Sequence, residues 1–285
     1  MALIKNKLVI LVTIIFLGYV GWWASFQSIV EDQGKSVQWF GGTYGFMALI
    51  GAVIGYFAAQ KWGGFKTILG KALMFFSLGL LAQEAGQLIY TYYTYGAHID
   101  VPYPSWGDAA YFGSVLLYIC GGIFLAKAVG VKFSLRPTKS NIIAIGIPLA
   151  LLIASYWIFL NNHVYDTSQP LTVFLDFGYP MGQAIYISLG LVAYLLSIKM
   201  LGGVMRAGIL FLIFALFVQY ISDWTFVYQT SRDLWIPGKF DDLFYLMAYF
   251  VMTITMIKFH LIYRDLINKT NQVAKMHDEA KVRGA

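Results

Sequence analysis

Long apolar stretches separated by short polar segments run the length of the chain. A helix needs about 20 mostly apolar residues to cross a bilayer. Eight segments have roughly that length and character, and runs such as Leu8 to Val12 lack the alternation of a transmembrane β-strand. The pattern therefore predicts an all-α integral membrane protein with about eight transmembrane helices. They are Leu8–Phe26, Tyr44–Gln60, Thr67–Tyr90, Asp108–Val129, Ile142–Leu160, Leu175–Ser197, Ala207–Tyr228 and Asp242–Ile262.

The amino-acid composition also indicates a membrane protein. Of the 285 residues, 59% are apolar and 12% are charged, whereas soluble domains carry about 25% charged residues. The single cysteine, Cys120, excludes an internal disulfide and a cysteine-rich zinc site. The first apolar stretch is about twice as long as the core of a signal peptide and ends in Trp22 and Trp23. We therefore expect it to be a membrane helix and not a cleaved leader.

Basic residues gather on one side of the predicted topology. If the N-terminus, the even-numbered connections and the C-terminus share a side, that side holds 17 of the 20 lysines and arginines but three of the 14 acids. The net charges of the two sides are then +14 and −8. The positive-inside rule places both termini in the cytoplasm. The basic face suits the anionic lipids of the bilayer, and no nucleic-acid partner is needed to explain it.

The two halves of the sequence match each other in register. A glutamine in one helix, then an aspartate and a tyrosine three residues apart in the next, occurs twice. The sets are Gln83, Asp108 and Tyr111, and Gln219, Asp242 and Tyr245. Copies with an even number of spans enter the membrane in the same direction, so they are related by an axis along the membrane normal. We expect a first four-helix repeat over 1–139, a second over 140–264 and a cytoplasmic helical tail over 265–285.

Charged side chains within spanning helices are costly and usually face the interior of the bundle. Glu84 and Asp223 lie within helices, about 20 and 25 Å from the inner face. Because capping cannot explain them, they need a partner, a proton, a cation or a water-filled pocket, with a buried structural network as the alternative. Asp108, Asp176 and Asp242 begin helices in this prediction, where an aspartate often serves only as a cap.

Aromatic residues crowd the outer level of these acids, and the inner interface has no comparable cluster. An interfacial belt explains many of them, but acids beside aromatics also suit a small cationic or aromatic ligand. We therefore expect a ligand pocket near the outer face. The candidate residues are Glu84, Gln87, Asp108, Tyr111, Asp176, Gln219, Asp223, Trp224, Asp242 and Tyr245.

Catalytic and cofactor motifs are missing from the sequence. There is no HExxH, no paired Cys/His spacing and no Gly-rich phosphate loop. Lys258, the lysine nearest to a retinal-type position, lies close to the inner face, where a lysine snorkels to the interface. We expect no cofactor, no metal and no enzymatic activity. An intramembrane acid site built on Glu84 and Asp223 is the enzymatic alternative.

Two short motifs carry a family resemblance. The segment from Pro102 to Tyr111 reads PYPSWGDAAY, similar to P-x-P-S-x-A-D-x-x-Y, and residues 177–183 read FGYPMGQ, similar to Y-P-x-G-D. Over about residues 8–262 the chain resembles the multi-helix membrane regions that precede GGDEF or GGDEF–EAL cyclic-di-GMP enzymes, and some kinases, in bacteria. The resemblance implies a sensory role in the bacterial cytoplasmic (inner) membrane. Gln183 replaces the acid of the second motif, and these 285 residues include no GGDEF or EAL motif.

These observations predict a sensory or receptor-like module that signals through its last helix, as a homodimer or to a cytoplasmic partner. One alternative is a small-solute, cation or proton-coupled transporter using the same acids. A transporter needs access from both faces, whereas the inner halves of these helices are nearly free of polar groups. Another alternative is an accessory subunit of a membrane complex, whose outer surface would be rich in small residues on one side.

Overall fold

The computed structural model describes residues 6–27, 34–129, 149–154, 168–197, 205–230 and 238–283, together with residues 146, 156–157 and 234. Helices and short connections make up all of these residues, and no strand occurs among them. The all-α prediction is therefore confirmed for the described part of the chain. The helices are α1 (Lys7–Phe26), α2 (Lys35–Thr43), α3 (Phe46–Lys61), α4 (Ile68–Thr91), α5 (Trp106–Ala128), α7 (Pro170–Ser197), α8 (Arg206–Thr230) and α9 (Phe240–Arg283).

Six helical segments in the described residues are long and apolar enough to cross a membrane. Six of the eight expected spans coincide with them, and α7 overlaps a seventh, Leu175–Ser197. The remaining expected span, Ile142–Leu160, lies largely outside the described residues. The six segments are Lys7–Phe26, Lys35–Lys61, Ile68–Gly96, Trp106–Ala128, Arg206–Phe226 and Phe240–Met276.

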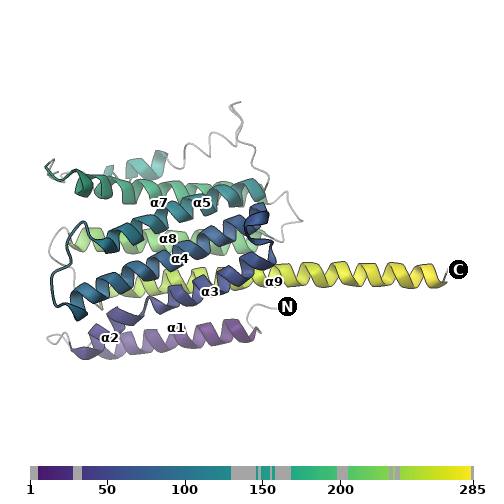
Figure 1. Ribbon diagram of the computed structural model, residues 1–285, viewed down its shortest axis with the longest axis horizontal. Coiled ribbons are helices and arrows are strands. Elements are labelled where there is room, and N and C mark those ends of the chain that lie inside the picture. The colour runs from purple at the N-terminus through teal and green to yellow at the C-terminus, as the bar shows by residue number, and fades with distance from the viewer. Residues whose placement is uncertain are drawn as a thin grey trace.

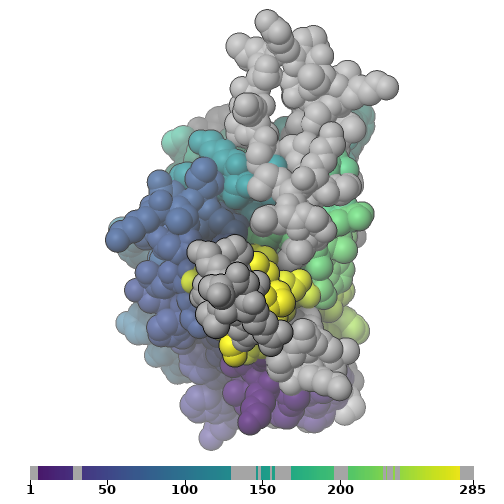
Figure 2. Space-filling model, turned by 90° about the vertical axis from the view of Figure 1, so that its right-hand side faces the viewer, coloured from purple at the N-terminus to yellow at the C-terminus, as the bar shows by residue number. Residues whose placement is uncertain are grey.

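Six helices form a closed ring. In order, α3 packs on α4, α4 on α5, α5 on α7, α7 on α8, α8 on α9, and α9 returns to α3. Helix α1 lies outside this ring, against α9 and α2. In Figure 1 the start of α1 and the end of α9 point to the same end of the bundle, and α9 continues well beyond it. Figure 2 looks at that end, where α9 in yellow emerges between blue and green helices.

Local sequence signals set where the helices begin and end. The side chain of Asn6 accepts the backbone N–H of Leu8 at 2.9 Å and so caps α1. Thr67 caps α4 in the same way, accepting the N–H of Gly70 at 3.0 Å. Between α3 and α4 the chain turns at Gly63, whose φ of +96° is a left-handed conformation that glycine adopts without strain.

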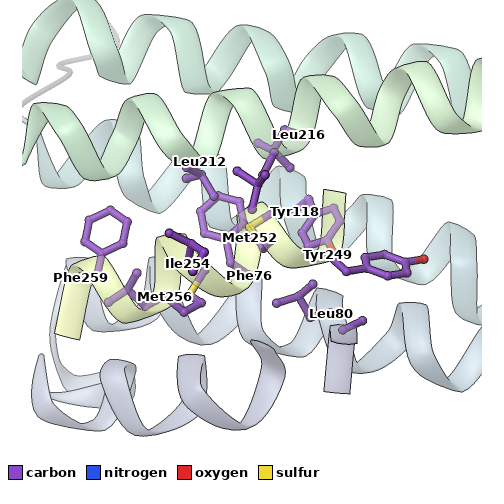
Figure 3. Close-up of a cluster of buried hydrophobic side chains, with 14 of the residues drawn as sticks. Phe76, Leu80, Tyr118, Leu212, Leu216, Tyr249, Met252, Ile254, Met256 and Phe259 are labelled. Carbon is purple, nitrogen blue, oxygen red and sulfur yellow. The ribbon is translucent and has the colours of Figure 1, made fainter. Parts of the chain in front are cut away.

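Large apolar and aromatic side chains fill the middle of the ring (Figure 3). Small residues let the helices approach closely, as is usual where lipid supplies no hydrophobic driving force between helices. A Cβ on Gly79 of α4 would lie 2.3 Å from the Tyr118 ring of α5, and one on Gly51 of α3 would lie 2.5 Å from Thr253 of α9. The central side chains include Phe76, Leu80, Tyr118, Leu212, Leu216, Tyr249, Met252 and Met256.

Helix α1 presents a largely apolar surface to the outside. Ile14 and Leu17 are 61% and 58% exposed, which is the arrangement expected of a helix that faces lipid. Toward the tail end of the ring, the buried hydroxyls bond to backbone carbonyls of their own or a neighbouring helix. Examples are Ser188 to Ala184 at 2.6 Å and Thr255 to Val251 at 2.8 Å. The hydrogen-bond donors of these hydroxyls are therefore satisfied by nearby backbone carbonyls.

Candidate ligand site

Buried polar side chains gather toward the end of the ring opposite the tail, where α4 and α8 finish and α5 and α9 begin. Hydrogen bonds connect most of them across helices. We call this set the polar network. Its members are Tyr44, Gln83, Gln87, Tyr111, Ser114, Gln183, Gln219, Asp223, Tyr245 and Tyr249.

Gln87 on α4 is the centre of the first half of the network. Its Oε1 accepts the hydroxyls of Tyr44 at 3.1 Å and Tyr111 at 3.0 Å. Its Nε2 donates to the carbonyl of Gly41 at 2.6 Å. One buried amide thus ties α2, the α2–α3 junction and α5 to α4.

Gln83, one turn earlier on α4, links the first half to the last helix. Its Nε2 donates to Ser114 Oγ of α5 at 2.6 Å. Its Oε1 accepts the hydroxyl of Tyr249 from α9 at 3.0 Å. Both ends of this buried amide are satisfied, so it holds α9 in a defined position against α4.

Asp223 on α8 is the centre of the second half. Its Oδ1 accepts the hydroxyl of Tyr245 from α9 at 2.6 Å. Its Oδ2 accepts the Nε2 of Gln183 from α7, and Gln219 Nε2 lies 3.4 Å from each carboxylate oxygen. Three neutral donors thus surround one carboxyl, which offers about four acceptor sites.

The two halves use the same bond in the same place. In the first, a tyrosine near the start of α5, Tyr111, donates to Gln87 of α4. In the second, a tyrosine near the start of α9, Tyr245, donates to Asp223 of α8. Each acceptor lies four residues after the matched glutamine in the sequence. The main difference is chemical, since an amide occupies one position and a carboxyl the other.

The aspartates at the starts of α5 and α9 act as caps. Asp108 Oδ2 accepts the N–H and the hydroxyl of Ser105, each at 2.8 Å, and Ser105 Oγ accepts the N–H of Asp108, which completes a capping box. Asp242 Oδ2 accepts the N–H of Gly238 at 2.7 Å. The hydroxyl of Tyr179 from α7 lies 3.3 Å from Asp108 Oδ1, so this cap also borders the ring.

The prediction that Asp176 begins a helix is wrong. Helix α7 starts at Pro170 because proline suits the first helical position, so Asp176 is already within the helix. Its Oδ1 accepts the hydroxyl of Tyr103 from the loop before α5, at 2.8 Å. Burial, and then this bond to a carboxylate, raise the pKa of the Tyr103 phenol well above its ordinary value. Asp176 therefore anchors a loop.

Glu84 differs from every other member of the predicted set. It is 3% exposed, and its Oε2 is buried without a hydrogen-bond partner in the described residues. It lies against Gly45, where the second span breaks between α2 and α3. A Cβ on Gly45 would come within 2.3 Å of Glu84 Oε2. The glycine thus leaves the space that the carboxyl fills.

Hydrogen bonds bring together five of the ten candidates, Gln87 with Tyr111 and Asp223 with Gln219 and Tyr245. Trp224 follows Asp223 on α8 and points about 100° away around the helix. Sequence reasoning did not select five members of the network. A glutamine within an apolar helix is the signal for two of them, and a tyrosine one turn from Tyr245 is the signal for a third. The five are Tyr44, Gln83, Ser114, Gln183 and Tyr249.

An open groove of about 530 Å³ lies between the end of α4 and the start of α5. Five apolar or aromatic residues line it, and none is acidic, so it differs from the acid-lined pocket that the sequence predicts. The lining residues are Leu88, Ile89, Tyr92, Tyr93 and Trp106. Within the described residues, no group of three or more His, Cys, Asp or Glu is arranged to hold a metal ion.

No family model, no curated protein and no solved structure matches this chain. The resemblance to membrane regions of cyclic-di-GMP proteins therefore stays a prediction from two motifs. In the second of these motifs, Gln183 donates to Asp223. An ionised aspartate there would instead place two carboxylates against each other, so the departure from the motif fits its local surroundings.

Proposed function

We propose that this protein is a sensory module of the bacterial cytoplasmic membrane, in which the polar network receives a signal and α9 transmits it to the cytoplasmic tail. One observation carries the proposal. Helix α9 bonds to both halves of the network, through Tyr245 to Asp223 and through Tyr249 to Gln83. The same continuous helix runs on to Arg283, beyond the bundle. A change in the network therefore acts directly on the tail.

A pair of parallel four-helix repeats accounts for the ring. Its order is α3, α4, α5 and then α7, α8, α9, so equivalent helices would lie opposite each other. The matched bonds of Tyr111 and Tyr245 support this symmetry. Helix α1 would then correspond to the segment Ile142–Leu160. The asymmetry of basic residues puts both termini in the cytoplasm and the network near the outer face.

Sensing is favoured over transport by the inner half of the ring. A transported solute or ion needs polar groups along its whole path. In the described inner half, buried hydroxyls such as those of Thr253 and Thr255 already donate to backbone carbonyls. The polar groups capable of receiving a small cationic or aromatic ligand are concentrated at the other end.

Native mass spectrometry of the protein released from lipid nanodiscs tests the proposal. We expect a dimer carrying a defined small adduct, and we expect Asp223→Asn to remove the adduct. Asp100→Asn is the matched control, because Asp100 is exposed in the loop before α5 and should leave the adduct in place. A bare monomer, or accumulation of labelled solute inside liposomes containing the protein, would contradict a sensory role.

A further inference from the structure

Glu84 is an ionisable group that the polar network encloses without using. Its Oε2 has no hydrogen-bond partner, and no lysine, arginine or histidine in the described residues pairs with it. Its two neighbours on α4, Gln83 and Gln87, are both satisfied by other groups. An ionised carboxylate buried without a countercharge costs several kcal/mol or more. Something must neutralise this carboxyl.

Among the described residues, two tyrosines interact electrostatically with Glu84, Tyr19 of α1 and Tyr249 of α9. Tyr44 lies beside Gly45 at the α2–α3 junction, and Asp242 of α9 lies near Tyr44. The Tyr44 and Tyr249 rings stack with centroids 6.3 Å apart. None of these side chains carries a positive charge. Since the described residues supply no countercharge, we take the neutralising group to be a proton or a cation from solution.

The neighbouring oxygens favour a proton over a metal ion. The carbonyl of Gly41 already accepts from Gln87, and the carbonyl of Thr43 accepts the Tyr19 hydroxyl at 2.8 Å. Gln87 Oε1 already accepts two phenols. A bound metal ion needs several oxygens free to coordinate it, whereas a proton needs only the carboxyl itself.

We propose that Glu84 is a proton-binding site, and that loss of its proton loosens the α2–α3 junction. In the structure the neutral carboxylic acid packs against Gly45, a turn residue between α2 and α3 whose φ and ψ stay in the helical region. Release of the proton to water at the outer face leaves a carboxylate that must draw in water. The junction is the element that can yield, because it is the turn that separates α2 from α3 and Gly45 has no side chain to pack against the carboxyl.

The site is one step from α9. Gln83, the residue next to Glu84, accepts the Tyr249 hydroxyl, and Tyr249 stacks on Tyr44 of the junction. Movement at the junction would therefore disturb both contacts of Tyr249. If this movement reaches the tail, the signal that the protein senses is the acidity outside the membrane. Only this last step rests on the proposed function. Proton binding itself does not depend on it.

Isotope labelling makes Glu84 observable without mutation. The chain has three glutamates, and two of them, Glu31 and Glu279, lie outside the membrane-spanning segments. Glutamates in water are ionised at neutral pH. In protein labelled with ¹³C-carboxyl glutamate and reconstituted in liposomes, infrared spectra should show one isotope-shifted band of a protonated carboxyl at neutral pH. We expect alkaline buffer to remove it.

Matched variants assign the band. Glu84→Gln should abolish it, and Asp223→Asn should leave it unchanged. The absence of a labelled band from the wild-type protein overturns the proposal, whether or not the Glu84→Gln protein folds. Loss of the band when sodium chloride replaces choline chloride at constant pH also overturns it, because the occupant would then be a metal ion.

Hydrogen exchange tests the second part. At alkaline pH, residues 41–49 of the wild-type protein should exchange faster than those of the Glu84→Gln protein, and at acidic pH the two should agree. Equal exchange at every pH overturns the loosening of the junction. If the band and the exchange behave as stated while no dimer or tail response appears, the proton site stands and the sensory output fails. If a dimer and a tail response appear but the labelled band does not, the proton site fails and the sensory function stands.

Discussion

Glu84 and Asp223 are both carboxyl groups inside apolar helices, but their surroundings are opposite. Asp223 receives three neutral donors, whereas Glu84 Oε2 receives none in the described residues. When the two halves of the sequence are aligned, the amide residue Gln87 is equivalent to Asp223, and Tyr220 is equivalent to Glu84. The first half thus bonds its network with neutral groups and leaves an acid spare. An acid within a membrane helix requires an explanation, and its partners decide between a structural and a functional one.

The largest effect should come from removing the satisfied acid. Asp223→Ala leaves the donors of Tyr245, Gln183 and Gln219 without their acceptor, which should cost about 3 kcal/mol of stability. Unfolding by denaturing detergent measures this loss. Glu84→Gln, which breaks no hydrogen bond among the described residues, is the comparison and should change stability little. Equal losses for the two variants would contradict the view that hydrogen bonding distinguishes the two acids.

A smaller effect is expected where Gly45 meets Glu84. The Cβ of Gly45→Ala would lie 2.3 Å from Glu84 Oε2 and 2.9 Å from Gln87 Cγ, which should cost about 1–2 kcal/mol. Adding Glu84→Ala should recover part of that cost, and a double-mutant cycle measures the recovery. Gly113→Ala is the control, because a Cβ there meets nothing within 4 Å. Additive losses would mean that the carboxyl does not fill this space.

The smallest effect separates the two matched tyrosines. Tyr245→Phe removes a bond to a carboxyl, which should cost about 1.5 kcal/mol, since bonds to charged groups are the stronger ones. Tyr111→Phe removes a bond to an amide that keeps Tyr44 as a donor, and about 0.6 kcal/mol is typical between membrane helices. Detergent unfolding of both variants measures the difference. A larger loss of stability for Tyr111→Phe would contradict the view that the bond to the Asp223 carboxyl is the stronger of the two.

The sequence predicts the spans well because each is defined by its own composition. Helix bounds are less well predicted, as at α7, where the apolar run suggested a start at Leu175 and Pro170 opens the helix. The segment from Lys35 to Gln60 likewise contains two helices with a break at Gly45, which average hydropathy does not reveal.

The network was only half predictable. The repeat points to Tyr111 and Tyr245 as equivalent residues, and both make the matched bond. The bond from Tyr249 to Gln83 joins residues 166 positions apart. It depends on α9 closing the ring against α3, and no local pattern encodes that closure. Nor could spacing show that Asp223 has hydrogen-bond partners while Glu84 Oε2 has none in the described part of the chain, because partners come from neighbouring helices.

The unbroken length of α9 has a mechanical consequence. From Tyr249 to Arg283 the helix runs without interruption over 35 residues, a rise of about 51 Å. A rigid rod of that length amplifies motion, so that a tilt of about 5° at Tyr249 displaces the far tip by about 4 Å. This sideways displacement is about half of the roughly 8–10 Å that separates the axes of two packed helices, so it is enough to change whether two adjacent tails pack against each other. A rearrangement too small to open a pore could therefore still be read at the tip.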